Sequence, residues 1–443
     1  MSGDDPKADS VGNQSLARRF ARLTFFNILA NLTVPLAGLI DAAILGHLDE
    51  IKFLAGVALG SIVFDYVFWS FGFLRMATTG MTAQSCGRGD SAAAERVLRR
   101  ALLLAATAGV LLVLLREPLA DLAFGLLSGS PETESAGLEY YGARIWGAPA
   151  ALLNLCFLGW FLGREESRIA LYMTAAANLT NIALDYLFIL EFGWAAEGAG
   201  WATMASQYVQ LTVALFFFLP RRSGEGWDWQ RLLDRDKLAM MFRLQRDIFA
   251  RTLLLVSAIA LFTDASARLG TEVLAANTLL LRLFTVAAYL IDGVAYAVES
   301  LAGVLHGAGE HRSLRRMMRW AMLVAVGFAL LFAGPLLVAP TWALGLLTSH
   351  EEIIRLGVAY SPWLLPVLVV GALAFVYDGL FLGLTAGRTL RNAMILSIAI
   401  YLPPALWAVH TQSPHLLWAS FALFMAARTL TLGWADRRRA SGR

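Results

Sequence analysis

The stretch NLTVPLAGLIDAAILGH, residues 31–47, decides how this sequence is interpreted. It lies in a run, residues 23–45, that is apolar and long enough to cross a bilayer as a helix of roughly 20 residues. Pro35 removes a helical hydrogen bond and bends such a helix. Asp41 is an acid at membrane depth, where acids usually face a protein interior or a water-filled cavity and handle an ion or a proton. The stretch therefore predicts a hinged helix with a titratable group; a kinked packing helix with a paired aspartate is the alternative.

The composition is that of a polytopic membrane protein. Of the 443 residues, 58% are hydrophobic and 16% are charged, and the mean hydropathy is +0.61. The first 20 residues contain no apolar segment, so we expect a short polar tail rather than a cleaved signal peptide. The net charge of +3 comes from the loops and does not indicate nucleic-acid binding. The two cysteines and the scattered histidines predict neither a disulfide framework nor a metal site.

Polar breaks divide the chain into about 12 predicted spans. Arginines recur in every second loop, which by the positive-inside rule places both termini in the cytoplasm of a plasma membrane, such as the inner membrane of a bacterium. An even number of spans agrees with this topology. The predicted spans are 20–47, 53–81, 97–118, 138–163, 168–192, 196–219, 246–268, 273–305, 317–339, 356–386, 389–409 and 415–435.

A long basic segment near the middle of the chain suggests an internal repeat. Gly87 and Gly307 begin similar motifs 220 positions apart, and Gly159 and Gly383 form a second pair 224 positions apart. Because each half has an even number of spans, the repeat is parallel, and two six-helix bundles with a cleft between them are expected. The predicted parts are a cytoplasmic tail 1–19, an N-terminal lobe 20–220, a cytoplasmic linker 221–245, a C-terminal lobe 246–436 and a basic tail 437–443.

The fifth predicted span carries a polar stripe. Asn178, Asn181 and Asp185 are spaced by three and four residues and therefore share one helical face. Thr203 in the next span and Asp41 in the first are expected at a similar depth. Such oxygen-bearing side chains suit Na⁺, while two nearby carboxyl groups can share a proton near neutral pH. The alternative is a hydrogen-bond network that only joins helices.

The second half has acids of its own. Asp292 and Glu299 are seven residues apart and share a helical face, which we expect to line the cleft between the lobes. Arg282 either forms a neutralised pair with Asp292 or acts separately. The sequence assigns no role to Asp264 or Asp65. The residues predicted to line the substrate cleft are Asn178, Asn154, Tyr140, Asp292, Glu299 and Asp378.

Four stretches resemble the multidrug and toxic compound extrusion (MATE) family, in particular its DinF-like branch. They are VPLAGLIDAAILGHL at 34–48, LRMATTGMTAQ at 74–84, NLTNIALD at 178–185 and DGVAYAVE at 292–299. The resemblance implies a 12-helix, two-lobe antiporter that expels organic cations and other amphipathic compounds in exchange for H⁺ or Na⁺. It also implies an N-lobe cation site formed by Asp41, Asn181, Asp185 and Thr203. The acidic pair of the NorM-like branch has no clean counterpart here.

We therefore predict a secondary active exporter rather than an enzyme, with H⁺ as the coupling ion, Na⁺ as the alternative, and no cofactor. The chain contains no GxxxxGK[ST] motif for binding ATP. Its expected partners are the lipid bilayer and small amphipathic or cationic substrates, and we expect a monomer. The competing interpretations are a lipid-linked saccharide flippase, an intramembrane enzyme and a passive channel. The sequence does not identify the substrates.

Overall fold

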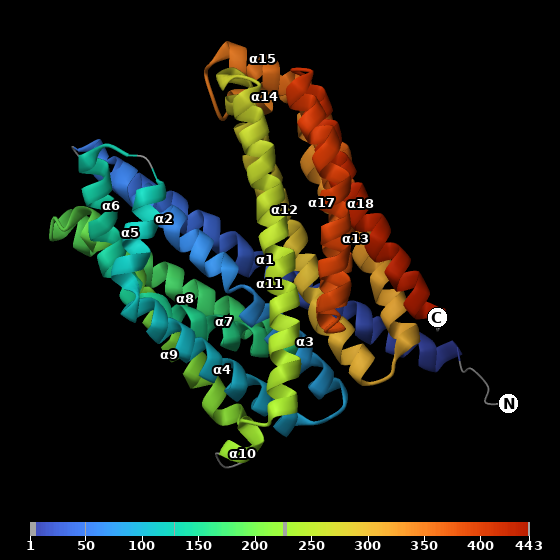
Figure 1. The fold of residues 1–443 in the computed structure, drawn as a ribbon. Coiled ribbons are helices and arrows are strands. Elements are labelled where there is room, and N and C mark those ends of the chain that lie inside the picture. The colour runs from blue at the N-terminus through green and yellow to red at the C-terminus, as the bar shows by residue number, and fades with distance from the viewer. Residues whose placement is uncertain (1–5, 49, 128, 225–227, 442–443) are drawn as a thin grey trace. The chain divides into compact units, whose positions relative to one another are not determined.

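The computed structural model describes residues 6–48, 50–127, 129–224 and 228–441 (Figure 1). Every regular element in these residues is a helix. Within the described part of the chain, 12 helical segments are long and apolar enough to cross a membrane, and each overlaps one of the predicted spans. This result confirms the predicted fold class, an all-α protein with about 12 membrane helices.

The described residues of the first half of the chain form nine α-helices. Short capping motifs set several of their starts; for example, the Asp90 side chain accepts a hydrogen bond from the Ala93 amide at 2.7 Å, where α4 begins. The helices are α1 (Pro6–Gly46), α2 (Ile51–Ser70), α3 (Phe73–Gly87), α4 (Ser91–Leu114), α5 (Arg116–Leu126), α6 (Pro131–Arg144), α7 (Ala148–Gly163), α8 (Ser167–Asp185) and α9 (Ala195–Phe218).

Nine further α-helices lie in the part of the second half that the structure describes. They are α10 (Trp229–Leu232), α11 (Arg235–Arg268), α12 (Thr271–Gly307), α13 (His311–Val338), α14 (Pro340–Gly345), α15 (Glu351–Tyr360), α16 (Leu364–Gly383), α17 (Gly387–His410) and α18 (Pro414–Ala440). The short helix α10 packs on α4 of the first half, where the Arg100 guanidinium donates a hydrogen bond to the Leu232 carbonyl at 3.0 Å. This contact anchors part of the segment that connects the two halves.

The chain divides into two compact units. One unit is Leu29–Phe242, and the other combines Met1–Ile28 with Arg243–Arg443. The boundary falls inside α1, so the first part of this helix packs with the second half of the chain; one such contact is the hydrogen bond from the Asn27 side chain to the Gly293 carbonyl at 3.5 Å. The N-terminal unit therefore begins nine residues later than the lobe 20–220 expected from the sequence.

The internal repeat has a single offset of 220 residues. A Cβ atom added to Gly159 would lie 2.5 Å from the Arg75 carbonyl oxygen, and one added to Gly379 would lie 2.4 Å from the Ala295 carbonyl oxygen. Both contacts join equivalent helices, α7 with α3 and α16 with α12, at positions 220 apart. The predicted pairing of Gly159 with Gly383 was wrong by four residues, one helical turn, because glycines recur at that spacing in both halves.

Two equivalent turns confirm this offset. Helices α3 and α12 end at Gly87 and Gly307, and the residues two positions later, Gly89 and Gly309, have φ angles of 74° and 75°. Glycine adopts this left-handed conformation without the steric cost that other residues pay. The two glycine motifs therefore end equivalent helices in the same way.

Candidate functional site

The centre of the candidate site is a pair of aspartates in the N-terminal unit. Asp41 on α1 and Asp185 at the end of α8 lie within hydrogen-bonding distance of each other through their side chains. The Asn181 side-chain amide donates a hydrogen bond to Asp185 Oδ2 at 2.8 Å. Asp185 is 1% exposed. The structure thus brings together three of the four residues predicted to form one site, from helices far apart in the sequence.

Each carboxyl group of this pair has an oxygen that is available for a ligand. The Oδ1 atoms of Asp41 and Asp185 are both buried and accept no hydrogen bond from the described residues. Burial without a partner is costly for such an oxygen, and two carboxylates in contact also repel each other. A proton or a cation between the two groups relieves both costs, so this geometry suits ion binding better than helix packing.

The backbone changes directly after Asp185. Helix α8 ends at this residue, and Tyr186–Glu191 continues as a π-helix. A π-helical turn is rare, and it alters the direction of the side chains around it; such turns occur frequently at functional sites. Nothing in the sequence predicted this distortion, because five of the six residues are apolar or aromatic, as in any membrane-spanning helix.

Pro35 lies inside α1, six residues before Asp41. Its ring removes the hydrogen bond that the amide of residue 35 would donate to the Asn31 carbonyl, and close to this point the Thr33 hydroxyl donates to the Ala30 carbonyl at 2.7 Å. The helix nevertheless continues through Pro35 to Gly46. The predicted hinge therefore lies at a weakened position of the helix that carries Asp41.

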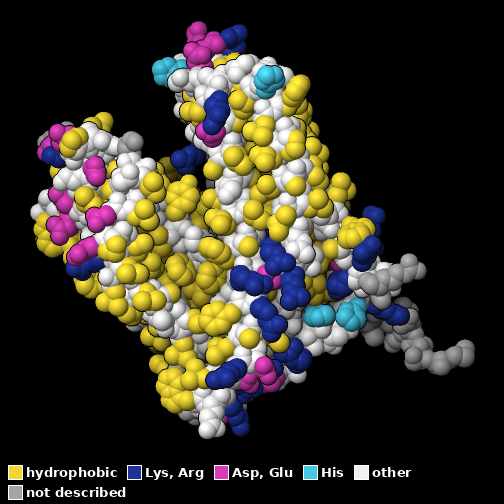
Figure 2. Space-filling view, in the orientation of Figure 1, with side chains coloured by type: hydrophobic (Ala, Val, Ile, Leu, Met, Phe, Trp, Pro, Cys, Tyr) yellow, Lys and Arg dark blue, Asp and Glu magenta, His cyan; other side chains and the backbone are white. Residues whose placement is uncertain are grey.

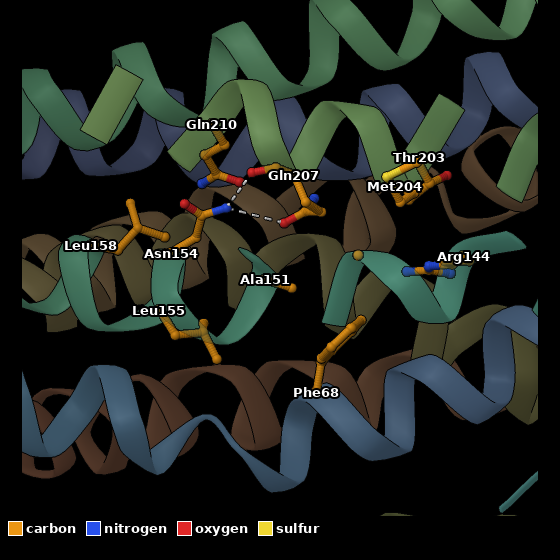
Figure 3. A pocket seen from close by; sticks show the side chains of 11 residues that line it. Phe68, Arg144, Ala151, Asn154, Leu155, Leu158, Thr203, Met204, Gln207 and Gln210 are labelled. Atoms are coloured by element: carbon orange, nitrogen blue, oxygen red, sulfur yellow. Dashed lines mark hydrogen bonds between the residues drawn. The ribbon is translucent and has the colours of Figure 1, made fainter. Parts of the chain in front are cut away.

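A pocket of about 180 Å³ lies in the same unit, between α7 and α9 (Figure 3). Asn154 and Gln207 face each other across it, and the Asn154 amide donates a hydrogen bond to the Gln207 carbonyl at 2.9 Å. Thr203 also lines the pocket, and its hydroxyl donates to the Ala199 carbonyl of its own helix at 2.9 Å. The pocket is therefore where the structure places Thr203 and Asn154, two of the predicted site residues.

Arg144 connects this pocket with the aspartate pair. It lies at one end of the pocket and is close enough to Asp41 for a Coulombic interaction. Its guanidinium donates a hydrogen bond to the Tyr140 hydroxyl and lies 4.4 Å from the centre of the Phe64 ring. The sequence analysis missed Arg144. A signal was present, because a basic residue inside a predicted span is as unusual as an acidic one.

Tyr140 and Asn178 are not among the residues that line this pocket. Tyr140 is 4% exposed, its ring packs against Phe64, and its hydroxyl accepts a hydrogen bond from Ser61 at 3.1 Å, so it supports Arg144 rather than lining the pocket. Asn178 is half-buried, and its Nδ2 atom is buried without a partner among the described residues. It therefore extends the polar stripe of Asn181 and Asp185 by one helical turn.

The acids of the other unit form a separate buried cluster. Asp378 on α16 forms ion pairs with Arg251 on α11 and with Arg428 on α18, the latter at 2.6 Å. All three side chains are at most 7% exposed. Asp292 is close enough to Arg428 to interact with it electrostatically. Asp378 is thus held between two buried arginines, which is a structural reason for an acid in this span, and its predicted place in the substrate cleft stays a prediction.

The remaining charged residues of that unit lie in different environments. Glu299 is 1% exposed, and its backbone packs against Gly383 of α16. Arg282 is exposed, and Asp264 forms an exposed ion pair with Arg268 at 2.8 Å. In the other unit, Asp65 is exposed on α2. The ion pair with Arg268 is a local structural reason for an acid at position 264.

Helices long and apolar enough to span a membrane, an internal repeat and buried charged side chains are features that polytopic membrane transporters share. The MatE family profile matches residues 27–187 and 248–407. DNA damage-inducible protein F of Escherichia coli K12 is 36% identical over 413 residues, which are 93% of this chain and 90% of that protein. The probable multidrug resistance protein NorM of Thermotoga maritima is 24% identical over 84% of this chain and 80% of that protein.

Solved structures share the fold. A crystal structure of MATE in the straight conformation superposes with a TM-score of 0.87 and 21% identity, and it covers 96% of both chains. A MOP superfamily transporter from Pyrococcus furiosus has the same TM-score and coverage at 20% identity. The chain belongs to the MATE family and to its DinF-like branch, as its sequence motifs predicted. It is an integral membrane transporter and, as a member of this family, not an enzyme.

Proposed function

We propose that this protein exports small amphipathic or cationic compounds in exchange for protons. The observation that carries the proposal is the contact between the Asp41 and Asp185 side chains inside the N-terminal unit. Two carboxyl groups in contact in an apolar environment are stable when they share a proton, so the pair can load and release one. The names of relatives such as the probable multidrug resistance protein NorM support export as the direction.

Protonation of the pair changes its contacts. A neutral Asp41 has no charge to interact with Arg144, and the hydrogen bond from Asn181 to a neutral Asp185 is weaker than one to a carboxylate. Both changes act on the end of α1 and on the π-helical turn after α8. Proton binding therefore favours a different arrangement of these two segments, as a coupled transporter requires.

Pro35 gives α1 a place to bend in response. A helix that lacks one hydrogen bond at this position deforms at lower cost than an uninterrupted helix. Solved MATE structures of similar fold are described as straight and bent conformations. For this chain we infer that bending at Pro35 transmits the protonation of Asp41 to the substrate pocket.

The substrate site that we infer is the pocket lined by Arg144, Asn154, Thr203 and Gln207. It combines apolar walls with a few hydrogen-bonding groups, which is typical of pockets for small amphipathic molecules. Arg144 is its one basic residue among the described residues, which favours an exporter over a flippase for anionic lipid-linked saccharides. Release of the proton from Asp41 strengthens the interaction of Asp41 with Arg144. Because Arg144 also lines the substrate pocket, proton exchange and substrate binding both act on this arginine.

Na⁺ is the alternative coupling ion. The unpaired Oδ1 atoms of Asp41 and Asp185 are hard oxygen donors of the kind that Na⁺ accepts. In this proposal the lobes 20–220 and 246–436 alternate in access around the substrate, as a monomer. The arginine-rich loops support an orientation in a bacterial inner membrane with both termini in the cytoplasm.

The test is efflux of ethidium from cells that express equal amounts of each variant. Asp41→Asn preserves the shape of the side chain but removes the titratable group, so efflux should be lost while insertion and folding are retained. Asp264→Asn makes the same chemical change in an exposed pair outside the site and is the matched control. Wild-type efflux by Asp41→Asn would overturn the proposal.

A further inference from the structure

A second pocket, far in sequence from the aspartate pair, lies between the start of α13 and the end of α18. Its volume is about 470 Å³. Four arginines of α13 and one of α18 line it, together with a single acid; these residues are Arg312, Arg315, Arg316, Arg319, Arg439 and Asp436. The pocket is therefore strongly basic, and it lies at the end of two membrane-spanning helices.

Within the part of the chain that the structure describes, acidic side chains do not balance the positive charge of this pocket. Asp436 is engaged by Arg439, which donates to its Oδ1 atom at 2.8 Å. The four α13 arginines form no ion pair with any residue that the structure describes. Arg312, Arg315 and Arg319 are exposed, so water screens part of the repulsion among these like charges, and an anionic ligand would lower it further.

The internal repeat provides a comparison. At an offset of 220 residues, Arg316 and Arg319 correspond to Arg96 and Arg99 of α4, whereas Arg315 corresponds to an acid, Glu95. In that unit Glu95 forms an ion pair with Arg99, and Asp90 lies 3.8 Å from Arg96. The α4 arginines thus have acidic partners within the protein. In α13 the position equivalent to Glu95 is occupied by Arg315, so the arginines there lack this acidic partner.

The surface next to the pocket is suited to acyl chains. Leu323 and Leu330 of α13 are 72% and 50% exposed, and they follow Arg316 at intervals of seven residues, so all three share one helical face. In Figure 2, Lys and Arg side chains gather over the lower part of this unit, and hydrophobic side chains cover much of its surface above them. A basic pocket that continues into an exposed apolar face matches a molecule with an anionic head and apolar tails.

We propose that this pocket binds the phosphate-bearing headgroup of an anionic phospholipid, with the acyl chains along Leu323 and Leu330. Guanidinium groups bind phosphate oxygens through paired hydrogen bonds, and basic pockets between membrane helices are suited to acidic lipid headgroups. Bound lipid would join the start of α13 to the end of α18. This lipid binding does not depend on the coupling ion or on the pocket between α7 and α9.

The experiment is native mass spectrometry of the purified full-length protein titrated with phosphatidylglycerol or phosphatidylcholine. We expect the double variant Arg316→Gln/Arg319→Gln to bind phosphatidylglycerol at least about tenfold more weakly than wild type. Binding of phosphatidylcholine should be equally weak in both proteins. The matched control is Arg437→Gln/Arg438→Gln, which removes the same charge from exposed residues at the same end of α18 but outside the pocket.

A second variant covers the possibility that the double variant folds poorly. Met322→Trp fills the apolar side of the pocket and keeps every arginine, so it should also lose phosphatidylglycerol binding. Equal binding of phosphatidylglycerol by wild type and both pocket variants would overturn the proposal. Displacement of the lipid by an excess of inorganic phosphate would show a site for free phosphate and would likewise contradict it.

Discussion

The carboxyl groups of Asp41 and Asp185 lie within hydrogen-bonding distance of each other although they come from α1 and α8. Each has one buried oxygen without a partner among the described residues, and Asn181 donates to the other oxygen of Asp185. Such an arrangement is costly as two bare carboxylates and favourable when a proton is shared. The proposed coupling mechanism follows from this contact.

Replacing the second acid of the pair should be as harmful as replacing the first. Asp185→Asn retains an oxygen that accepts the hydrogen bond from Asn181, so the protein should fold, but the pair can no longer exchange a proton. We expect efflux of norfloxacin from cells to fall by at least about tenfold, which corresponds to about 1.4 kcal/mol. If the Asp185→Asn protein pumps at the wild-type rate in equal amounts, the two acids do not share one coupling site.

Pro35→Ala restores a hydrogen bond to α1 and should stiffen the helix. Because the aspartate pair is unchanged, proton binding should be preserved while turnover slows. The measurement is the initial rate of efflux together with binding of a fluorescent substrate to the purified variant. Slower efflux with unchanged binding is expected; a loss of binding would show that Pro35 shapes the site rather than its movement.

The Arg251, Asp378 and Arg428 cluster should contribute to stability. Asp378→Ala leaves two buried guanidinium groups without their carboxylate, and removing one partner of a buried ion pair typically costs about 3–5 kcal/mol. We expect a clearly lower midpoint in thermal unfolding of the purified protein. The control, Asp264→Ala, breaks an exposed pair and should change stability by less than about 1 kcal/mol. Equal midpoints for the two variants would contradict this account.

The close contact between α16 and α12 at Gly379 gives a further prediction. In Gly379→Ala, the new methyl group would lie 2.4 Å from the Ala295 carbonyl oxygen, so α16 must move away from α12. Overpacking of this kind costs about 1–3 kcal/mol, and the yield of monodisperse protein should fall. Gly327→Ala in α13 is the control, since its methyl group meets no atom within 4 Å. Similar yields for both variants would show that this contact tolerates expansion.

The sequence predicted the features that depend on local pattern. Twelve apolar runs predicted the twelve spans, and spacing within one helix placed Asn181 and Asp185 on one face. Family motifs then indicated the DinF-like branch. These predictions succeeded because apolar length and helical periodicity are properties of short segments.

Apart from the proximity of Asp41 to Asp185, features that depend on tertiary contacts were not predicted. The partners of Asp378 are Arg251 and Arg428, 127 and 50 residues away, and no spacing rule identifies them. The role of Arg144 depends on its proximity to Asp41 on another helix. The register of the repeat was one turn off because glycines spaced by four residues allow two alignments; the carbonyl contacts of Gly159 and Gly379 resolve it.

The most direct test of proton coupling uses purified protein in liposomes with an imposed pH gradient and no Na⁺. Wild-type protein should move ethidium against its gradient while protons flow the other way, and a protonophore should stop this movement. Asp41→Asn should show neither flux, whereas Asp264→Asn should show both. Transport that requires a Na⁺ gradient, or proton-driven transport that persists in Asp41→Asn, would contradict the account.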